Sequence, residues 1–514
     1  MAQQSYTLSL ARLQMPFLAA RQTRTVITTG SRESNPENSP SIIYMENVMP
    51  TAYGFRSVGR YREVTVATPP TVFASYIGVR TIIGDEGFSY TLLLMTGVSS
   101  TMKVVKESDT FLIDTGLNIF NAAEQLTHIA NVNGITYCSF GLGNTVYTYD
   151  ESASVFVAVS LTAIGSGNLG ITGSSGYMLA WTKDAIAWSS TIDPTDFTPS
   201  QVTGAGGGRV AEAVGDILFI APTSFGALIY CKGNIVAATY TGNTRFPFKF
   251  RSVQNSGGNI AQTNVAYEET SDTHFALTKY GMQAINSQQA QVILPEITDF
   301  MREGKLTTYS TSAGFGEIDL DFVGSDYIKL IASRYLIISI GYTTTTPKCF
   351  IYDLILKRYG QLQFTRGVGP EPWDYAISFY EIDNTVTGGL FGLGSIGIMR
   401  ADGSLVSLSW NPPSNHSSVM AFGKIQYAKD TMLTLHQIQL ESEEAADATM
   451  SVLDYPSLDG KVLLDPVAPY VASTEDAKVY KGSFHTAALS HTLVIRGLFS
   501  LSTVQILYSV FSRR

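Results

Sequence analysis

The segment Gly176-Tyr-Met-Leu-Ala-Trp-Thr-Lys-Asp-Ala-Ile-Ala-Trp-Ser-Ser190 contains two short apolar runs separated by a polar turn. Runs rich in aromatic and aliphatic residues on both sides of a turn predict a β-hairpin. An isolated hairpin is marginally stable in water and needs further sheets to pack against. This stretch therefore predicts a domain that is built from several such hairpins.

The same pattern of strand, short turn and strand recurs along the middle of the chain. Copies begin near residues 134, 176, 215, 273, 334 and 388. The first spacings are about 40 residues, which is the period of β-propeller blades, and the longer ones fit blades with inserted loops. Radial stacking of four-stranded sheets covers both faces of each sheet, so the repeat predicts an irregular β-propeller. A β-sandwich, or several small β-domains, is the alternative with the same strand rhythm.

Three regions are expected from the change in sequence character. Residues 1–70 are expected to form an N-terminal arm with the first strands, and they include the polar stretch Gly30–Pro40, which predicts an exposed loop. Residues 71–410 hold the propeller-like repeat, and residues 411–514 are expected to form a C-terminal β-sandwich-like domain. The predicted fold is thus all-β: an irregular β-propeller with an added small β-sandwich or barrel from the C-terminal part, with or without strands from the N-terminal segment.

Helical patterns are few. Asn118–Ile129 could form one short helix and Leu294–Leu306 another, with Pro295 in its first turn. The longest clean apolar run, Tyr335–Tyr342, is far shorter than the roughly 20 residues of a membrane helix, so no direct membrane span is expected.

Composition excludes several classes of protein. The chain has 514 residues, of which 45% are hydrophobic, so disorder over most of its length is excluded. Its 34 Lys and Arg residues and 43 Asp and Glu residues give a net charge of −9. A protein that binds nucleic acid over its whole surface needs an excess of basic residues, so this class is excluded. Three dispersed cysteines support neither a cysteine zinc site nor a disulfide framework, and they suit assembly in a reducing cytosol.

No catalytic, cofactor-binding or metal-binding constellation is predicted, and the chain is not expected to be an enzyme. Of the six histidines, only His485 and His491 are close in sequence, and their spacing is no established metal-binding motif. We expect the histidines to be ordinary surface or turn residues.

One carboxylate cluster stands out. Glu317, Asp319 and Asp321 alternate with apolar residues, so in a strand they lie on one face. The simplest interpretation is the solvated face of a half-buried strand, and a calcium or catalytic role is an alternative. A third interpretation is a negative wall of a channel, past which nucleic acid slides without adhering, because like charges repel.

Several ordered segments resemble the tail nozzle or tail hub proteins of short-tailed bacteriophages (podoviruses), also known as packaged-DNA-stabilisation proteins. The resemblance is carried, in chain order, by Asn47–Pro50, Gly59–Val64, Ala180–Asp184, Ile186–Ser190, Asp193-Pro194 with Phe197, Gly215–Ala221, Tyr240–Gly242, Ile337–Ile340, Phe350–Asp353 and Arg358–Gly360, followed by a β-rich C-terminal region.

The resemblance implies a virion structural protein without catalytic residues. It implies a homo-oligomer of six copies that forms a ring below the portal and its head-to-tail adaptor, extends and closes the channel for DNA ejection, and docks tail fibres, spikes or a needle. Double-stranded DNA would pass through the lumen without specific binding. Such a protein is assembled in the cytoplasm of the host bacterium and ends in the virion tail.

The alternative function is a carbohydrate-binding or carbohydrate-active propeller, such as an adhesin or a glycosidase. Tyr and Trp side chains could supply stacking platforms, and Asp374 and Glu381 are candidate carboxylates. A glycosidase requires two carboxyl groups that converge at about 5 to 9.5 Å, which is the feature that separates the two hypotheses.

Overall fold

The computed structural model describes the strands and many of the turns that join them. The described residues are 4–10, 24–26, 42–57, 61–65, 73–97, 102–107, 112–119, 128–139, 143–164, 167–259, 265–268, 271–294, 305–310, 314–319, 328–332, 335–340, 348–363, 376–381, 396–400, 405–408, 418–422, 424–426, 431–442, 447–455, 462–463, 470–471 and 479–512. Every regular element among them is a β-strand, and no helix in this part of the chain is long and apolar enough to cross a membrane.

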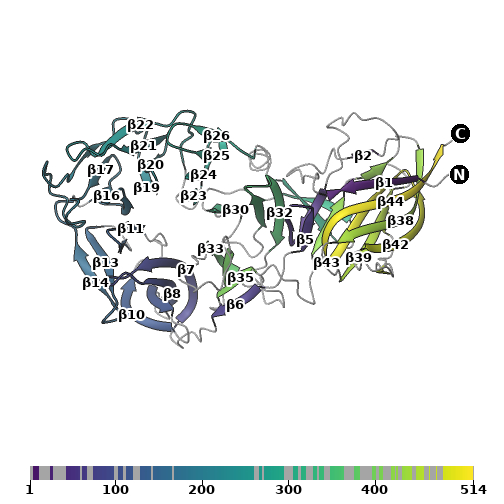
Figure 1. Cartoon of the computed structure of the whole chain (residues 1–514), viewed down its shortest axis with the longest axis horizontal. Coiled ribbons are helices and arrows are strands. Elements are labelled where there is room, and N and C mark those ends of the chain that lie inside the picture. The colour runs from purple at the N-terminus through teal and green to yellow at the C-terminus, as the bar shows by residue number, and fades with distance from the viewer. Residues whose placement is uncertain are drawn as a thin grey trace.

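Seven four-stranded antiparallel units form a β-propeller, which confirms the predicted fold class (Figure 1). The first three blades are β7–β10 (Phe73–Ile83, Ser89–Gly97, Met102–Glu107, Leu112–Ile119), β11–β14 (His128–Val132, Ile135–Ser139, Thr145–Asp150, Val155–Ser160) and β15–β18 (Gly170–Ser174, Tyr177–Trp181, Ala185–Trp188, Gly206–Arg209). Blades four and five are β19–β22 (Ile217–Thr223, Gly226–Cys231, Ile235–Tyr240, Phe248–Ser252) and β23–β26 (Val265–Glu268, Thr273–Thr278, Gly281–Ile285, Ala290–Val292). Blade six is β29–β32 (Ile328–Ala332, Tyr335–Ile340, Lys348–Asp353, Arg358–Gln363).

The seventh blade closes the ring with a strand from the N-terminal region. Strands β33 (Ala376–Glu381), β34 (Ile396–Arg400) and β35 (Leu405–Leu408) are completed by β6 (Tyr61–Thr65) as the outer strand. The inner strand β33 lies beside β7 of blade one, so the first and last blades meet. Because main-chain hydrogen bonds join residues from both ends of the repeat, opening the ring requires breaking a sheet.

Close backbone approach holds neighbouring blades together. A Cβ atom on Gly173 in β15 would lie 2.3 Å from the carbonyl oxygen of Asn131 in β11, so only glycine fits this contact between blades two and three. Blades three to five share an apolar core in which Trp181 and Tyr230 are almost fully buried. The predicted hairpins near 134, 176, 215, 273 and 334 each form two paired strands here, and these predictions are confirmed.

The C-terminal region is a sandwich of two sheets, and the N-terminal segment contributes to both. One sheet contains β1 (Gln4–Ser9), β38 (Thr431–Ser442), β41 (Tyr470–Val471), β42 (Val479–Ala488) and β44 (Ser500–Ser512). The other contains β2 (Arg24–Val26), β3 (Ile42–Glu46), β36 (Val419–Phe422), β37 (Lys424–Gln426), β39 (Asp447–Tyr455), β40 (Val462–Leu463) and β43 (Ser490–Leu498). Alternating side chains of the two sheets, such as Leu435, Ile438, Met450 and Ile495, form one buried core.

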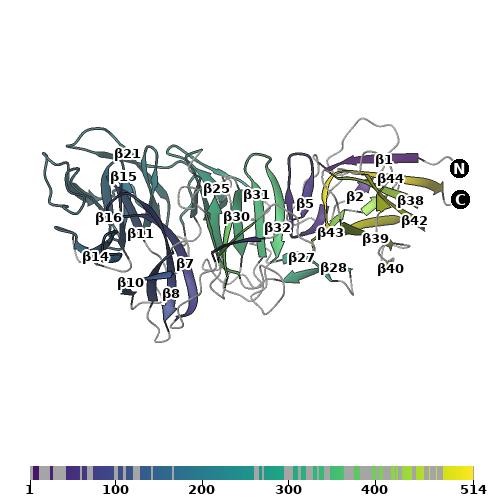
Figure 2. The ribbon, with the colours of Figure 1, turned by 60° about the horizontal axis from the view of Figure 1, so that its bottom comes forward.

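Blade six of the propeller and one sheet of the sandwich are parts of one continuous sheet. The outer strand β32 of blade six pairs with β4 (Val48–Pro50), β4 pairs with β5 (Phe55–Ser57), and β5 pairs with β44 of the sandwich. Figure 2 shows β32, β5 and β44 following one another along the long axis of the molecule. The two parts are therefore joined by main-chain hydrogen bonds as well as by the chain itself.

Both helix predictions are wrong where the structure describes them. Residues 118–119 end β10, and 128–129 begin β11; 120–127 lie outside the described residues. Leu294 has a φ of 50°, which no right-handed helix adopts, and residues 305–306 begin β27 (Lys305–Ser310). Pairing with neighbouring strands outweighs the weak local helix signals. The polar loop at 30–40 and the repeat start at 388 lie outside the described residues.

Candidate functional site

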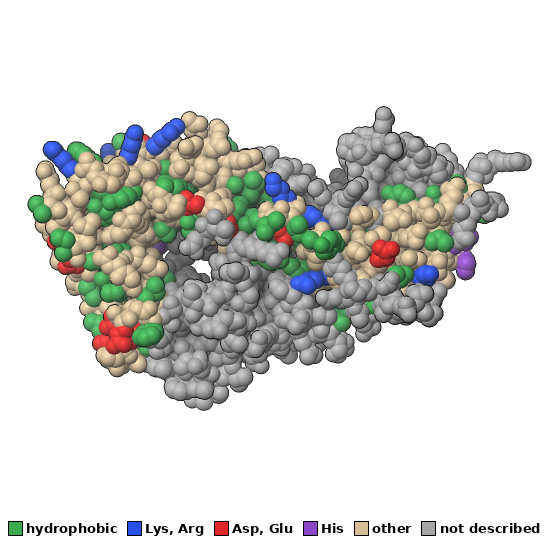
Figure 3. Space-filling view, in the orientation of Figure 1, with side chains coloured by type: hydrophobic (Ala, Val, Ile, Leu, Met, Phe, Trp, Pro, Cys, Tyr) green, Lys and Arg blue, Asp and Glu red, His purple; other side chains and the backbone are tan. Residues whose placement is uncertain are grey.

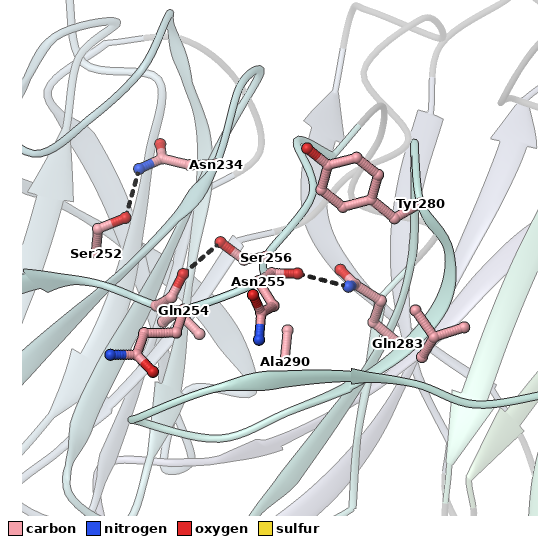
Figure 4. A pocket seen from close by; sticks show the side chains of 10 residues that line it. Asn234, Ser252, Gln254, Asn255, Ser256, Tyr280, Gln283 and Ala290 are labelled. Atoms are coloured by element: carbon pink, nitrogen blue, oxygen red, sulfur yellow. Dashed lines mark hydrogen bonds between the residues drawn. The ribbon is translucent and has the colours of Figure 1, made fainter.

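A cavity of about 660 Å³ lies between blades four and five, at the ends of their outer strands (Figure 4). Its lining is uncharged and consists of amide, hydroxyl and apolar side chains. The lining residues are Asn234, Ser252, Val253, Gln254, Asn255, Ser256, Tyr280, Gln283, Ala290 and Val292.

The turn after β22 forms one wall of this cavity, and Gln283 holds the turn in place. Asn255 has a φ of 58°, a left-handed conformation that asparagine tolerates better than most residues. The Nε2 atom of Gln283 donates to the carbonyl oxygen of Asn255 at 2.9 Å, and its Oε1 atom accepts from the backbone N–H of Gly257 at 3.0 Å. One buried amide thus fixes both sides of the turn.

Asn234 plays a similar structural part on the other side of the cavity. Its Nδ2 atom donates to the carbonyl oxygen of Glu212 at 2.9 Å and to Oγ of Ser252 at 3.1 Å, and its Oδ1 atom accepts from the N–H of Val214 at 2.9 Å. The amide is therefore fully engaged and has little capacity left for a ligand.

Three side chains remain available. The amides of Gln254 and Asn255 and the hydroxyl of Tyr280 make no hydrogen bond with the described part of the chain, and Tyr280 is 51% exposed. The Lys279 ammonium lies 5.2 Å from the centroid of the Tyr280 ring, so a neutral polar molecule would bind to the remaining exposed part of the ring and to the amide donors and acceptors. Among the described residues, the lining offers no carboxylate, imidazole or amine for proton transfer.

Two of the three predicted acidic residues are described, and they do not line the cavity. Glu317 and Asp319 belong to β28 (Gly314–Asp319), where they pair with Thr307 and Lys305 of β27. This two-stranded sheet is separate from the blade sheets, and β27 contacts β3 of the sandwich. Asp321 lies outside the described residues, and the channel-facing role of the three acids stays a prediction.

Of the two candidate carboxylates of the alternative function, Glu381 is described and does not line the cavity. Glu381 ends β33 in blade seven, and Asp374 lies outside the described residues. Among the described residues no group of His, Cys, Asp and Glu side chains could hold a metal ion.

Two histidines differ from the expectation of surface or turn positions. His274 and His491 are fully buried. The Nε2 atom of His491, in one sheet of the sandwich, lies 2.8 Å from the carbonyl oxygen of Leu433 in the other, so this ring joins the two layers. The prediction was wrong for both. Successive side chains of a strand point to opposite faces of the sheet whatever their polarity, so a histidine can point into the core. A buried imidazole is stable there when a hydrogen-bond partner lies within reach.

His274 joins blades four and five. Its Nε2 atom lies 3.1 Å from the carbonyl oxygen of Pro222, which only accepts, so Nε2 carries the proton and Nδ1 accepts from the hydroxyl of Tyr230 at 2.8 Å. Burial lowers the pKa of His274 to about 4, although the bond to Pro222 and the charge of Asp272 act in the opposite direction. The ring is thus neutral and structural.

The sequence contained only a weak signal for the cavity. The Asn255-Ser-Gly-Gly258 run predicts a turn. Nothing in the sequence indicated that Tyr280 and Gln283, from the next blade, would face that turn, because the juxtaposition depends on how two blades pack.

No protein-family model matches the chain, and no curated protein matches it. Among solved structures, the U3-55K structure has a TM-score of 0.38 at 5% identity and covers 68% of this chain and 98% of its own. The RRP9 WD40 repeats have a TM-score of 0.38 at 6% identity, covering 68% and 99%. YCF48 from Cyanidioschyzon merolae has a TM-score of 0.34 at 14% identity, covering 68% and 98%. Similarities this low carry no functional argument, and the propeller is assigned from its own sheet topology.

Proposed function

We propose that this chain is a non-enzymatic structural subunit of a bacteriophage tail, a tail nozzle or hub. In this proposal six copies form a ring below the portal and head-to-tail adaptor, extend and close the DNA ejection channel, and dock tail fibres, spikes or a needle. Double-stranded DNA passes through the lumen without specific binding.

The observation that carries the proposal is the continuous sheet from blade six to the sandwich. Gln361 of β32 pairs with Val48 of β4, and Arg56 of β5 pairs with Ser500 of β44. Separate domains linked by a flexible segment move independently, whereas a shared sheet transmits force through its hydrogen bonds. A rigid two-part subunit suits a collar that has to hold pressurised DNA.

Buried side chains reinforce the same junction. Arg358 of blade six donates to the carbonyl oxygens of Thr51 and Leu10, which belong to the N-terminal segment. Its guanidinium also lies 4.2 Å from the ring centroid of Phe55. Since charged donors to buried carbonyls are among the stronger hydrogen bonds, this residue resists bending between propeller and sandwich.

Native mass spectrometry tests the proposal. The full chain is mixed with purified portal–adaptor rings and, as the control, with portal rings that lack the adaptor. We expect a complex of defined copy number only when the adaptor is present. Failure to bind the adaptor rings of every short-tailed phage tested contradicts the nozzle assignment.

The cavity between blades four and five favours a second candidate function, the binding of a neutral carbohydrate. Tyr280 offers a half-exposed ring, and Gln254 and Asn255 offer free amides, which is the chemistry that binds sugar hydroxyls and the apolar face of a sugar ring. Saturation-transfer NMR with neutral oligosaccharides of bacterial surface polysaccharides tests this function. Binding that is lost in Tyr280→Ala and kept in Tyr53→Ala, another exposed tyrosine, supports it; no transfer to any oligosaccharide contradicts it.

A further inference from the structure

The structure gives the side-chain exposure of the outer strands of blades two to five, which are β14, β18, β22 and β26. One of these strands, β14, differs from the others in how its edge is protected. An outer strand presents a row of unpaired main-chain groups, which native proteins protect with charge, glycine or short length. Strand β18 is Gly-Gly-Gly-Arg, β22 is Phe-Lys-Phe-Arg-Ser, and β26 has only three residues.

Strand β14 has none of these protections. Its sequence is Val-Phe-Val-Ala-Val-Ser, without charge, proline or glycine, and it spans six residues. Val155 is 38% exposed and Val157 is 43% exposed. Strand β10 of blade one lies alongside β14, but β14 pairs only with β13 and is the last strand of its sheet. An apolar strand at the end of its sheet, with no second strand hydrogen-bonded to it, is a template for contact with another chain.

Acidic side chains border this edge. Asp150 ends β13 and Glu151 begins the turn that leads into β14, and Asp85 and Glu86 lie in the turn between β7 and β8. The two turns are held together because Oε1 of Glu151 accepts from the N–H groups of Glu86 and Phe88, at 3.0 and 3.1 Å. Figure 3 shows red side chains gathered at this end of the propeller.

The opposite charge lies on another outer strand of the same propeller. Lys249 and Arg251 of β22 are exposed, as are Arg245 before it and Arg209 on the neighbouring β18. Lys249 and Arg251 make no ion pair with the described part of the chain. In Figure 3 the blue side chains stand on the side of the propeller away from the red group. Strand β22 pairs only with β21 and is the last strand of its sheet. Its basic side chains keep it from pairing with a like-charged edge and match it to an acidic one.

We propose that the β14 edge of one copy binds the β22 edge of a second copy, so that apolar and main-chain groups meet between the strands and the acidic border faces the basic side chains. The inference rests on the proposed function only in so far as that function requires a homo-oligomer. Because the two edges belong to blades two and four, the contact is head-to-tail, and each copy keeps one free edge of each kind for the next neighbour. Repetition of such a contact closes into a ring when the rotation allows it.

The association is tested by sedimentation of the full chain over a range of concentrations and salt. We expect concentration-dependent oligomers that weaken as salt rises, since exposed charges are screened. Val157→Lys places a charge on the apolar edge, and Lys249→Glu with Arg251→Glu reverses the basic edge. Each variant is expected to weaken association about tenfold or more. Ile355→Lys, at a 72% exposed position in blade six, is the matched control and leaves association unchanged.

A crosslinking experiment separates this contact from any other mode of assembly. Val157→Cys protein and Lys249→Cys protein are mixed under oxidising conditions. A disulfide-linked dimer that forms in the mixture and not in either protein alone supports the proposal. Wild-type protein that stays monomeric, oligomers that Val157→Lys leaves intact, or the absence of the mixed dimer overturns it. Binding to adaptor rings by a protein that fails these tests leaves the nozzle function standing, whereas edge-dependent oligomers that bind no adaptor ring refute that function alone.

Discussion

The Nη2 atom of Arg358 lies 2.7 Å from the carbonyl oxygen of Leu10, although the two residues are separated by 348 positions in the sequence. Arg358 belongs to the last strand of blade six, and Leu10 follows the first strand of the sandwich. Both side chains are buried. The propeller is thus anchored to the N-terminal segment by a buried guanidinium group, whose hydrogen bonds to backbone carbonyl oxygens replace those it would make with water.

Arg358→Ala is expected to destabilise this junction. The substitution removes two hydrogen bonds and the contact with Phe55, and it leaves the carbonyl oxygens of Thr51 and Leu10 without their donor. We expect a loss of about 3 kcal/mol in the free energy of unfolding measured in urea. Arg245→Ala, at an exposed arginine, is the control and should change it by less than about 0.5 kcal/mol. Equal effects of the two variants would contradict the anchoring role.

His274 should make stability depend on pH. Burial lowers its pKa from 6.5 to about 4 in the folded state, so below pH 6.5 the unfolded chain takes up a proton that the folded protein refuses. The contribution of the neutral ring to the free energy of unfolding is fully present above pH 6.5. It is lost as the pH falls towards 4, and the total loss is about 3 kcal/mol. His274→Gln keeps a donor and an acceptor without a titrating group. Urea unfolding between pH 4 and 8 should therefore give a shallower slope for this variant than for the wild type, and parallel slopes would refute the assignment.

Gly54 should tolerate no side chain. A Cβ atom at this position would lie 1.8 Å from the carbonyl oxygen of Leu501, where the β4–β5 hairpin meets the sandwich. Gly54→Ala must therefore push β5 away from β44 and lower the midpoint of thermal unfolding. Gly208→Ala is the matched control, because a Cβ there meets nothing within 4 Å. A normal melting curve for Gly54→Ala would show that the strands do not approach in this way.

The acidic strand offers a test of the channel hypothesis. If Glu317, Asp319 and Asp321 line the DNA path, replacing all three with Lys adds attraction to a polyanion and should slow DNA ejection while folding stays intact. The readout is the rate of ejection from particles that carry the variant, with circular dichroism to check the fold. Unchanged ejection and infectivity would return these residues to an ordinary solvated surface.

The sequence predicted the fold class and the strands of five hairpins, but it wrongly predicted helices where β10, β11 and β27 have strands. Runs such as Tyr177–Trp181 and Ile217–Thr223 were predictable as strands because short runs of aromatic and aliphatic residues are bounded by turn residues, and both are local properties. The spacing of about 40 residues between the first hairpins indicated propeller blades, and this spacing can also be read directly from the sequence. Ring closure by β6 was beyond such reasoning, since nothing local in Tyr61–Thr65 says that it pairs with β35, more than three hundred residues later.

The candidate site was far less predictable than the fold. Gln283 and Asn255 meet because blades four and five pack side by side, and the sequence contains no motif for that contact. The burial of His274 and His491 was missed for the same reason, because each ring bonds to a backbone carbonyl oxygen on another sheet, and His274 also bonds to Tyr230 of the neighbouring blade. Every residue has a backbone carbonyl, so the sequence does not show which carbonyl will accept a hydrogen bond from a buried side chain. Buried polar side chains with backbone partners are therefore hard to predict from sequence.

Electron microscopy of the full chain assembled on portal–adaptor rings tests the central claim most directly. We expect a closed ring of six elongated subunits below the adaptor, each with a seven-bladed propeller held in a fixed orientation to its sandwich, around an open lumen. Subunits that remain single, or propellers that take variable orientations to their sandwiches in class averages, would contradict it.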